Sequence, residues 1–68
     1  MPSTAIRRFD YDAQGRALDV TFVTGRRYRY FGVPERVAAG LREARSKGGF
    51  FNARIRDRFG FEELERED

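Results

Sequence analysis

Apolar and polar residues alternate along the first part of the chain, as in β-strands that bury one face. Two such segments, Ala5–Tyr11 and Ala17–Val23, flank residues Asp12–Gly15, whose aspartate and glycine are typical of a type I turn. They predict a β-hairpin in which Phe9 lies opposite Leu18. The second segment alternates most regularly, with Leu18, Val20 and Phe22 on one face and Asp19, Thr21 and Val23 on the other. We therefore expect this strand in the middle of the sheet.

A third strand is predicted at residues Arg27–Phe31. Within it the two tyrosines, Tyr28 and Tyr30, point to one side of the sheet, and the two arginines, Arg27 and Arg29, point to the other. The length of the loop before this strand decides which pair faces the core, because a slip of one residue exchanges the two faces.

Two loop lengths are consistent with the sequence. A two-residue loop would place the arginines of the third strand on the buried face. A three-residue loop, in which Gly25 helps to form a bulge, pairs Phe22 with Tyr28 and Val20 with Tyr30. We prefer the second register because it keeps charged side chains out of the core.

A helix is predicted after the sheet. Pro34 suits its first turn, where a missing N–H costs nothing, and Glu35 adds a favourable negative charge there. Apolar residues recur at helical spacing at Val37, Leu41 and Ala44. Gly48 and Gly49 are expected to end this helix as its C-cap, with Lys47 complementing its carboxyl end.

The last apolar residues permit two structures. Phe51, Ile55 and Phe59 are four residues apart, as in a second short helix, whereas Phe59, Gly60 and Phe61 could form an extended stretch that closes the core. We thus predict an α+β domain over residues 1–61, with a three-stranded antiparallel β-meander, one main α-helix and a short C-terminal helical or extended segment. Residues 62–68 are expected to form an acidic C-terminal tail.

Charge is unevenly distributed between these two parts. Residues 62–68 carry five acids and one arginine, a net charge of −4, which leaves +7 on residues 1–61 within a total of +3. A basic body attracts polyanions through a field that salt weakens. The acidic tail could fold back over that surface and compete with a ligand, or it could be solvated and frayed.

The residue types present exclude several classes of chemistry. The chain has no cysteine and no histidine, which removes thiol nucleophiles, imidazole bases and the usual zinc ligands. The only serines, Ser3 and Ser46, have no neighbouring base in the sequence. We therefore expect a protein that is not an enzyme and binds no cofactor or metal. Without an apolar membrane span or signal peptide, we also expect it in the cytoplasm and away from membranes.

The strongest candidate for ligand chemistry is the stretch Gly25–Phe31, where arginines interleave with aromatic residues. Guanidinium groups pair with phosphates and aromatic rings stack on bases, so the pattern indicates nucleic acid, most plausibly RNA. A second basic run, Arg54, Arg56 and Arg58, forms one patch only if the segment is extended. The candidate nucleic-acid-binding residues are Arg26, Arg27, Tyr28, Arg29, Tyr30, Lys47, Asn52, Arg54, Arg56 and Arg58.

Several of these residues also have purely structural interpretations. Tyr28 and Tyr30 could pack in the core, in which case Arg27 and Arg29 would form an exposed arginine ladder. Asn52 could cap the next helix instead of contacting a base, and the three later arginines could form a solvated surface. A protein-interaction module that recruits an acidic partner is the alternative function, and the chain could be a monomer or a weak homodimer.

Several short fragments occur in a characteristic order. They are Tyr11-Asp12, Leu18-x-Val20-x-Phe22 with Gly25, Tyr28-x-Tyr30, Val33-Pro34, Ala44-x-Ser46-Lys47-Gly48 and Phe51-Asn52-x-x-Ile55-Arg56. Over nearly all of residues 5–61 the chain resembles the KTSC domain, a small module found at the carboxyl terminus of some lysyl-tRNA synthetases and alone in small bacterial proteins. The resemblance implies RNA binding, with tRNA as one candidate. It implies nothing about the acidic residues that follow.

Overall fold

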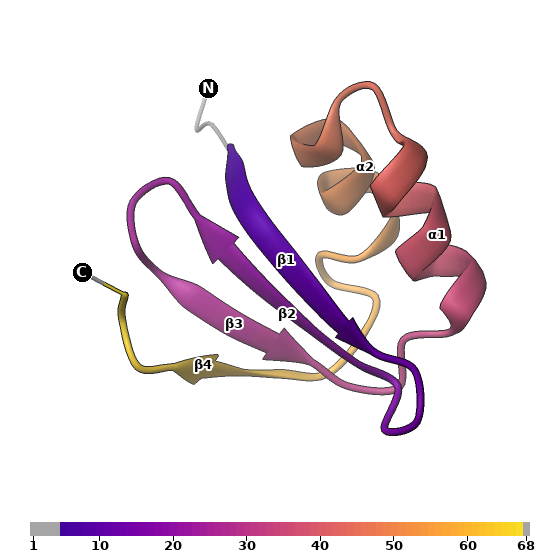
Figure 1. Cartoon of the computed structure of the whole chain (residues 1–68), viewed down its shortest axis with the longest axis horizontal. Helices are drawn as coiled ribbons and strands as arrows, with labels where there is room; N and C mark the ends of the chain where they lie inside the picture. The colour runs from indigo at the N-terminus through magenta and orange to yellow at the C-terminus, as the bar shows by residue number, and fades with distance from the viewer. Residues whose placement is uncertain (1–4, 68) are drawn as a thin grey trace.

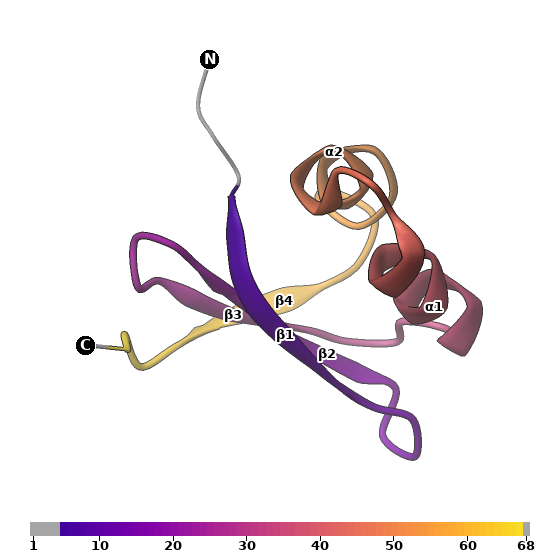
Figure 2. The same cartoon turned by 45° about the horizontal axis from the view of Figure 1, so that its top comes forward.

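The computed structural model describes residues 5–67 and contains a four-stranded antiparallel sheet in the order β1-β2-β3-β4. Both helices cover the same face of the sheet and leave the other face open (Figures 1 and 2). In chain order the elements are β1 (Ile6–Asp12), β2 (Ala17–Phe22), β3 (Arg27–Tyr30), α1 (Glu35–Glu43), α2 (Lys47–Arg54) and β4 (Phe61–Leu64). The predicted α+β meander is confirmed, and a second helix and a fourth strand are added to it.

The first hairpin keeps the predicted faces in a shifted register. Phe9 pairs with Val20 and Tyr11 pairs with Leu18, so the expected pairing of Phe9 with Leu18 is wrong by two residues. The loop covers residues 13–16 instead of 12–15 and contains Arg16 at φ 55. A shift of two residues preserves the pleat, so the side chains predicted to face the core still do so.

The second hairpin shows the same kind of shift. Tyr28 pairs with Val20 and Tyr30 pairs with Leu18, so the predicted partners Phe22 and Val20 are each two residues too late. The turn has the expected three residues but lies one residue earlier, because the Phe22 amide donates to the Arg26 carbonyl at 2.9 Å and leaves residues 23–25 between them. Both tyrosines nevertheless lie on the face that the helices cover, as predicted.

The junction between the helices differs from the prediction. The glycine pair does not end α1, which stops at Glu43; both glycines lie in the first turn of α2. Ser46 is the N-cap of α2, and its Oγ accepts a hydrogen bond from the Gly49 amide at 3.0 Å. This side-chain cap satisfies an otherwise unpaired amide, and so the chain begins a new helix here. Lys47 does complement α1, because its Nζ donates to the Arg42 and Ala44 carbonyls at 3.2 and 3.3 Å.

The core lies between the sheet and the helices. Its largest fully buried side chains are those of Phe51, Leu18, Leu41, Ile55, Val20 and Val33. Each comes from an apolar position of a predicted strand or helix, or from the loops beside them. None of the helices formed by residues 5–67 is long and apolar enough to cross a membrane.

Part of the expected acidic tail belongs to the sheet. The predicted boundary after residue 61 falls inside β4, where Phe61 pairs with Tyr30 and Glu62 pairs with Arg29. Beyond the strand, the Glu67 amide donates to the Gly25 carbonyl at 2.9 Å. The Glu67 carboxylate also forms ion pairs with Arg7 and Arg8 of β1. The acidic segment therefore folds back, and it neutralises arginines near the β2–β3 turn.

Candidate nucleic-acid interface

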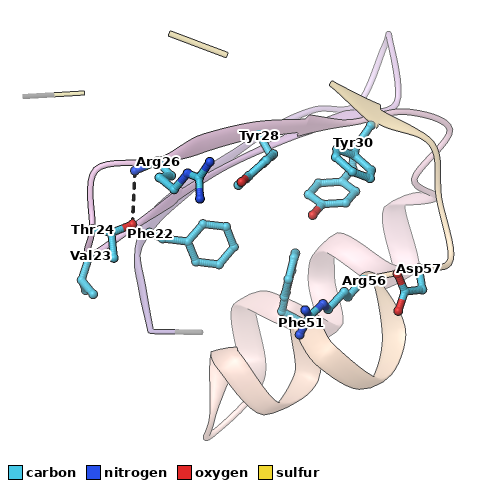
Figure 3. A pocket seen from close by; sticks show the side chains of 10 residues that line it. Phe22, Val23, Thr24, Arg26, Tyr28, Tyr30, Phe51, Arg56 and Asp57 are labelled. Atoms are coloured by element: carbon cyan, nitrogen blue, oxygen red, sulfur yellow. Dashed lines mark hydrogen bonds between the residues drawn. The ribbon is translucent and has the colours of Figure 1, made fainter. Parts of the chain in front are cut away.

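A cleft of about 400 Å³ opens between α2 and the adjoining part of the sheet. Figure 3 shows Phe22, Tyr28 and Tyr30 of the sheet facing Phe51 of α2 across it. The complete lining is Phe22, Val23, Thr24, Arg26, Tyr28, Tyr30, Phe51, Arg56, Asp57 and Phe61. Four of the residues predicted from the sequence meet here, namely Arg26, Tyr28, Tyr30 and Arg56. The volume lies within the range of small-ligand sites, about 300–1,000 Å³.

Aromatic rings form the walls of the cleft and hold one another in place. The Phe51 ring meets the rings of Phe22 and Tyr30 edge to face, at centroid distances of 5.3 and 5.4 Å. Tyr28 meets Phe22 at 5.9 Å and Phe61 at 5.8 Å in the same manner. Edge-to-face pairs are favourable and restrict ring motion. The rings therefore present a preformed apolar surface.

The aromatic residues of the cleft differ in how much they offer to a ligand. Tyr30 is 5% exposed and belongs to the core, which is the structural interpretation considered for both tyrosines. Tyr28 is half-buried at the edge of the core, and Phe61 is 57% exposed. Phe61 pairs with Tyr30 in the sheet, and their ring centroids lie 5.4 Å apart. Phe61 and Tyr28 are thus the rings with surface available for stacking.

Charged groups stand at the rim of the cleft. Arg26 lies at the end of the β2–β3 turn, and its Nε donates to a carboxylate oxygen of Glu63 at 3.3 Å. Arg56 follows α2, and its Nη1 donates to Oδ1 of Asn52 at 3.3 Å. Both arginines are exposed, and within residues 5–67 each side chain makes one hydrogen bond, at 3.3 Å. Such weak surface pairs leave a guanidinium able to exchange its partner for a phosphate.

The turn after α2 brings Asp57 to the same rim. The Phe51 carbonyl accepts hydrogen bonds from the amides of both Ile55 and Arg56 at 2.9 Å, which ends the helix tightly. The chain then reverses through Asp57 in the left-handed region, at φ 64. Aspartate tolerates this conformation better than most residues. In Figure 3 the side chains of Arg56 and Asp57 lie beside the opening, below Tyr30.

The charges of Arg56 and Asp57 both affect the pKa of Tyr30. Burial raises the pKa of Tyr30 above its ordinary value, and the neighbouring Tyr28 raises it further. Arg56 acts to lower this pKa, and Asp57 acts to raise it. Arg56 and Asp57, which carry opposite charges, therefore both lie at the rim of the cleft on the side of α2.

The open face of the sheet carries Arg27 and Arg29, as expected when the tyrosines face the helices, but both arginines have partners there. Arg29 donates from Nε and Nη2 to the two carboxylate oxygens of Asp19, at 2.8 and 3.0 Å. This hydrogen bond and the aspartate charge raise the pKa of Arg29. The Nε of Arg27 is buried without a hydrogen-bond partner in the described structure, and its Nη1 donates to the Glu65 carbonyl at 3.3 Å. The acidic residues of β2 and the C-terminal segment thus engage both arginines.

The remaining predicted residues lie outside the cleft lining. Arg54 is on α2, and its guanidinium carbon lies 5.9 Å from the centre of the Phe50 ring. Lys47 serves the carboxyl end of α1, and Asn52 lies within α2 instead of capping it. Arg58 is exposed in the turn between α2 and β4, one residue after Asp57. A single patch of Arg54, Arg56 and Arg58 would need an extended segment, and the structure has a helix followed by a turn.

Six residues of the cleft lining are absent from the predicted site, namely Phe22, Val23, Thr24, Phe51, Asp57 and Phe61. From the sequence, Phe22 was expected on the buried face of a strand and Phe61 in a stretch that closes the core. Their joint position depends on β4 returning beside β3 and on α2 packing over the sheet, which no local pattern encodes. An aspartate before Arg58 in a stretch that ends at Gly60 was a weak turn signal that could have drawn attention to this segment.

The sheet is antiparallel, both helices cover one of its faces, and an aromatic cleft lies beneath the second helix. These features define a small α+β domain with one open sheet face. The family model of the KTSC domain matches residues 2–59. The chain therefore belongs to the KTSC domain family. A KTSC domain protein from Yersinia pestis, whose crystal structure is known, is 34% identical and superposes with a TM-score of 0.87 over 96% of this chain and 92% of that one.

Similar sequences occur alone and within longer proteins. An uncharacterized protein of Stutzerimonas stutzeri is 40% identical over 52 residues, which are 76% of this chain and 73% of that protein. A lysine–tRNA ligase of Nostoc punctiforme is 39% identical over 61 residues, and one of Trichormus variabilis is 36% identical over 59. The match covers 90% and 87% of this chain but only 11% and 10% of these ligases. The match to these two proteins is thus confined to a small part of a much longer enzyme.

Proposed function

We propose that this domain is a non-enzymatic RNA-binding module and that the cleft beneath α2 is its binding surface. One observation carries the proposal: exposed guanidinium groups of Arg26 and Arg56 flank an aromatic cleft whose Phe61 ring is 57% exposed. Stacked bases and paired phosphates are how proteins bind single-stranded RNA. Arg58 follows Asp57 in the turn after α2, just outside the cleft lining, and adds a third cation for the RNA backbone.

The relatives support an RNA context. Two lysine–tRNA ligases each contain a segment that resembles this chain, and such enzymes act on tRNA. A small basic module beside a catalytic domain would add phosphate contacts without taking part in the chemistry. The same module alone would bind exposed single strands of RNA with modest sequence preference.

Binding of a fluorescently labelled, unstructured RNA can be followed by anisotropy at two salt concentrations. For single strands the logarithm of affinity falls by about 0.7 per phosphate contact for each unit of log salt. Three contacts, from Arg26, Arg56 and Arg58, predict roughly twentyfold weaker binding after a fourfold rise in salt. Arg56→Gln should weaken binding and reduce the salt dependence by about one contact.

Arg29→Gln is the matched control, because it removes the same charge from the opposite face of the sheet. We expect it to bind RNA nearly as well as the parent chain, provided that its circular dichroism spectrum is native. Equal losses in the two variants would mean that only overall charge matters. No binding at low salt would refute RNA binding itself.

A protein-interaction function is the second candidate, and a separate feature favours it. β4 lies at the edge of the sheet, and no strand formed by residues 5–67 pairs with its outer side. Edge strands can pair with an extended segment of another protein. In that case binding would depend weakly on salt and would survive Arg56→Gln.

A further inference from the structure

The charges at the rim of the cleft are not all suited to phosphate. Asp57 contributes a carboxylate to the lining, next to Arg56. A module that recognised the RNA backbone alone would gain nothing from an acid at this position, because a carboxylate repels phosphate. Its backbone conformation at φ 64 is one that most residues other than glycine avoid, although aspartate tolerates it better than most. Asp57 therefore calls for a role beyond backbone binding.

The surroundings restrict what Asp57 can recognise. Tyr30 and Asp57 line the same cleft, and Figure 3 shows the Asp57 side chain below Tyr30 at its opening. Aromatic rings of Phe22, Tyr28 and Phe61 supply walls that a flat apolar group can contact. The lining thus combines a flat-sided apolar space with a hydrogen-bond acceptor at its rim.

An ionised carboxylate only accepts hydrogen bonds, and its two oxygens can accept two parallel ones. Guanine is the RNA base whose Watson–Crick edge offers two adjacent donors, its ring N1–H and its exocyclic amino group. Adenine and cytosine each offer an amino donor beside an acceptor nitrogen, which a carboxylate would repel. Uracil offers one N–H between two acceptor oxygens. The acid therefore favours guanine over the other three bases.

We propose that the cleft binds one unpaired guanine of a single-stranded RNA and that Asp57 selects this base by accepting from its Watson–Crick edge. The inference rests on the RNA-binding function proposed above and adds a base preference to it. Charge complementarity supports this occupant: the acid faces base donors, while Arg26 and Arg56 stand at the rim where the flanking phosphates would lie. Free guanine nucleotides share the base but lack the second flanking phosphate.

Short oligouridine strands that differ in one central base provide the test. The parent chain should bind the strand with a central guanine about tenfold more tightly than those with adenine, cytosine or uracil, as expected for one bidentate contact. Asp57→Asn replaces one acceptor oxygen with a donor, and asparagine also tolerates the left-handed conformation. This variant should lose the guanine preference and still bind RNA with a strong salt dependence.

Asp10→Asn is the control, because it removes the same charge from an exposed residue on the open face of the sheet. It should keep the guanine preference. Equal affinity of the parent chain for all four strands, or a preference that survives Asp57→Asn, would overturn the role of Asp57 and leave RNA binding intact. Failure to bind any strand at low salt would remove the proposed function as well. Guanosine monophosphate binding more tightly than the guanine strand would assign the cleft to a free nucleotide instead.

Discussion

Replacement of Gly25 by alanine tests how the C-terminal segment is held against the sheet. Gly25 lies in the β2–β3 turn at φ +94, a conformation that side chains disfavour. A Cβ atom built there would stand 2.6 Å from the carbonyl oxygen of Glu67, which is too close for any real contact. The same two residues are joined by the hydrogen bond from the Glu67 amide to the Gly25 carbonyl. The substitution must therefore displace the segment that follows β4.

The cost can be estimated from these two effects. The left-handed conformation costs an L-residue about 1–2 kcal/mol, and loss of the hydrogen bond costs about 1 kcal/mol. Gly25→Ala should then lower the free energy of unfolding by about 2–3 kcal/mol. In a domain whose total is about 5–15 kcal/mol, a urea titration resolves such a change.

Gly32→Ala is a closely matched control. Gly32 also has a positive φ, +72, but a Cβ atom there meets nothing within 4 Å. It should cost only the conformational part, about 1–2 kcal/mol. Hydrogen exchange at the Glu67 amide gives a second observable, which should accelerate in Gly25→Ala and stay unchanged in Gly32→Ala. Equal costs in the two variants, with the Glu67 amide equally protected in both, would refute the docking of the C-terminal segment.

Two further predictions concern the second helix and the core. Ser46→Ala should lower the free energy of unfolding in urea by about 1 kcal/mol, because the Gly49 amide loses its cap; an unchanged midpoint would argue against this helix start. The raised pKa of Tyr30 means that this group ionises first in the unfolded chain, at about pH 10, so the stability that Tyr30 contributes should be fully present below that pH and be lost above it. Tyr30→Phe should make the alkaline loss of stability smaller, and an identical alkaline profile would contradict the burial of the hydroxyl.

The sequence predicted the strands and their faces well, because a period of two residues depends only on local alternation. Leu18 and Val20 are buried as expected, and both tyrosines of β3 face the helices. The registers were wrong by two residues, since turn geometry sets them and several turns suit the same residues. A shift of two residues leaves each side chain on the same face of the sheet, so the core residues of the strands were still predicted correctly.

Features that depend on distant partners were missed. Glu62 and Glu63 read as a solvated acidic tail, yet they form a strand because Arg29 and Tyr28 of β3 lie opposite them. Gly48 and Gly49 were missed for a local reason: they were predicted to end a helix, but the side chain of Ser46, three residues before Gly49, caps the start of a new one. The candidate site was only partly predicted because it, too, depends on distant partners. Its arginines and tyrosines were found as a run in the sequence, but sheet pairing sends them to two faces, and only tertiary packing adds Phe61 and Asp57.

The most direct test of RNA binding by the cleft is an amide NMR titration of isotope-labelled protein with single-stranded RNA at two salt concentrations. Duplex DNA serves as a comparison for nonspecific attraction. We expect RNA to shift the amides of Arg26, Tyr28, Arg56, Asp57 and Phe61, with smaller shifts at high salt and little change at Asp19 on the open face. Shifts concentrated on Asp19 and its neighbours, or no shifts at low salt, would contradict a binding surface beneath α2.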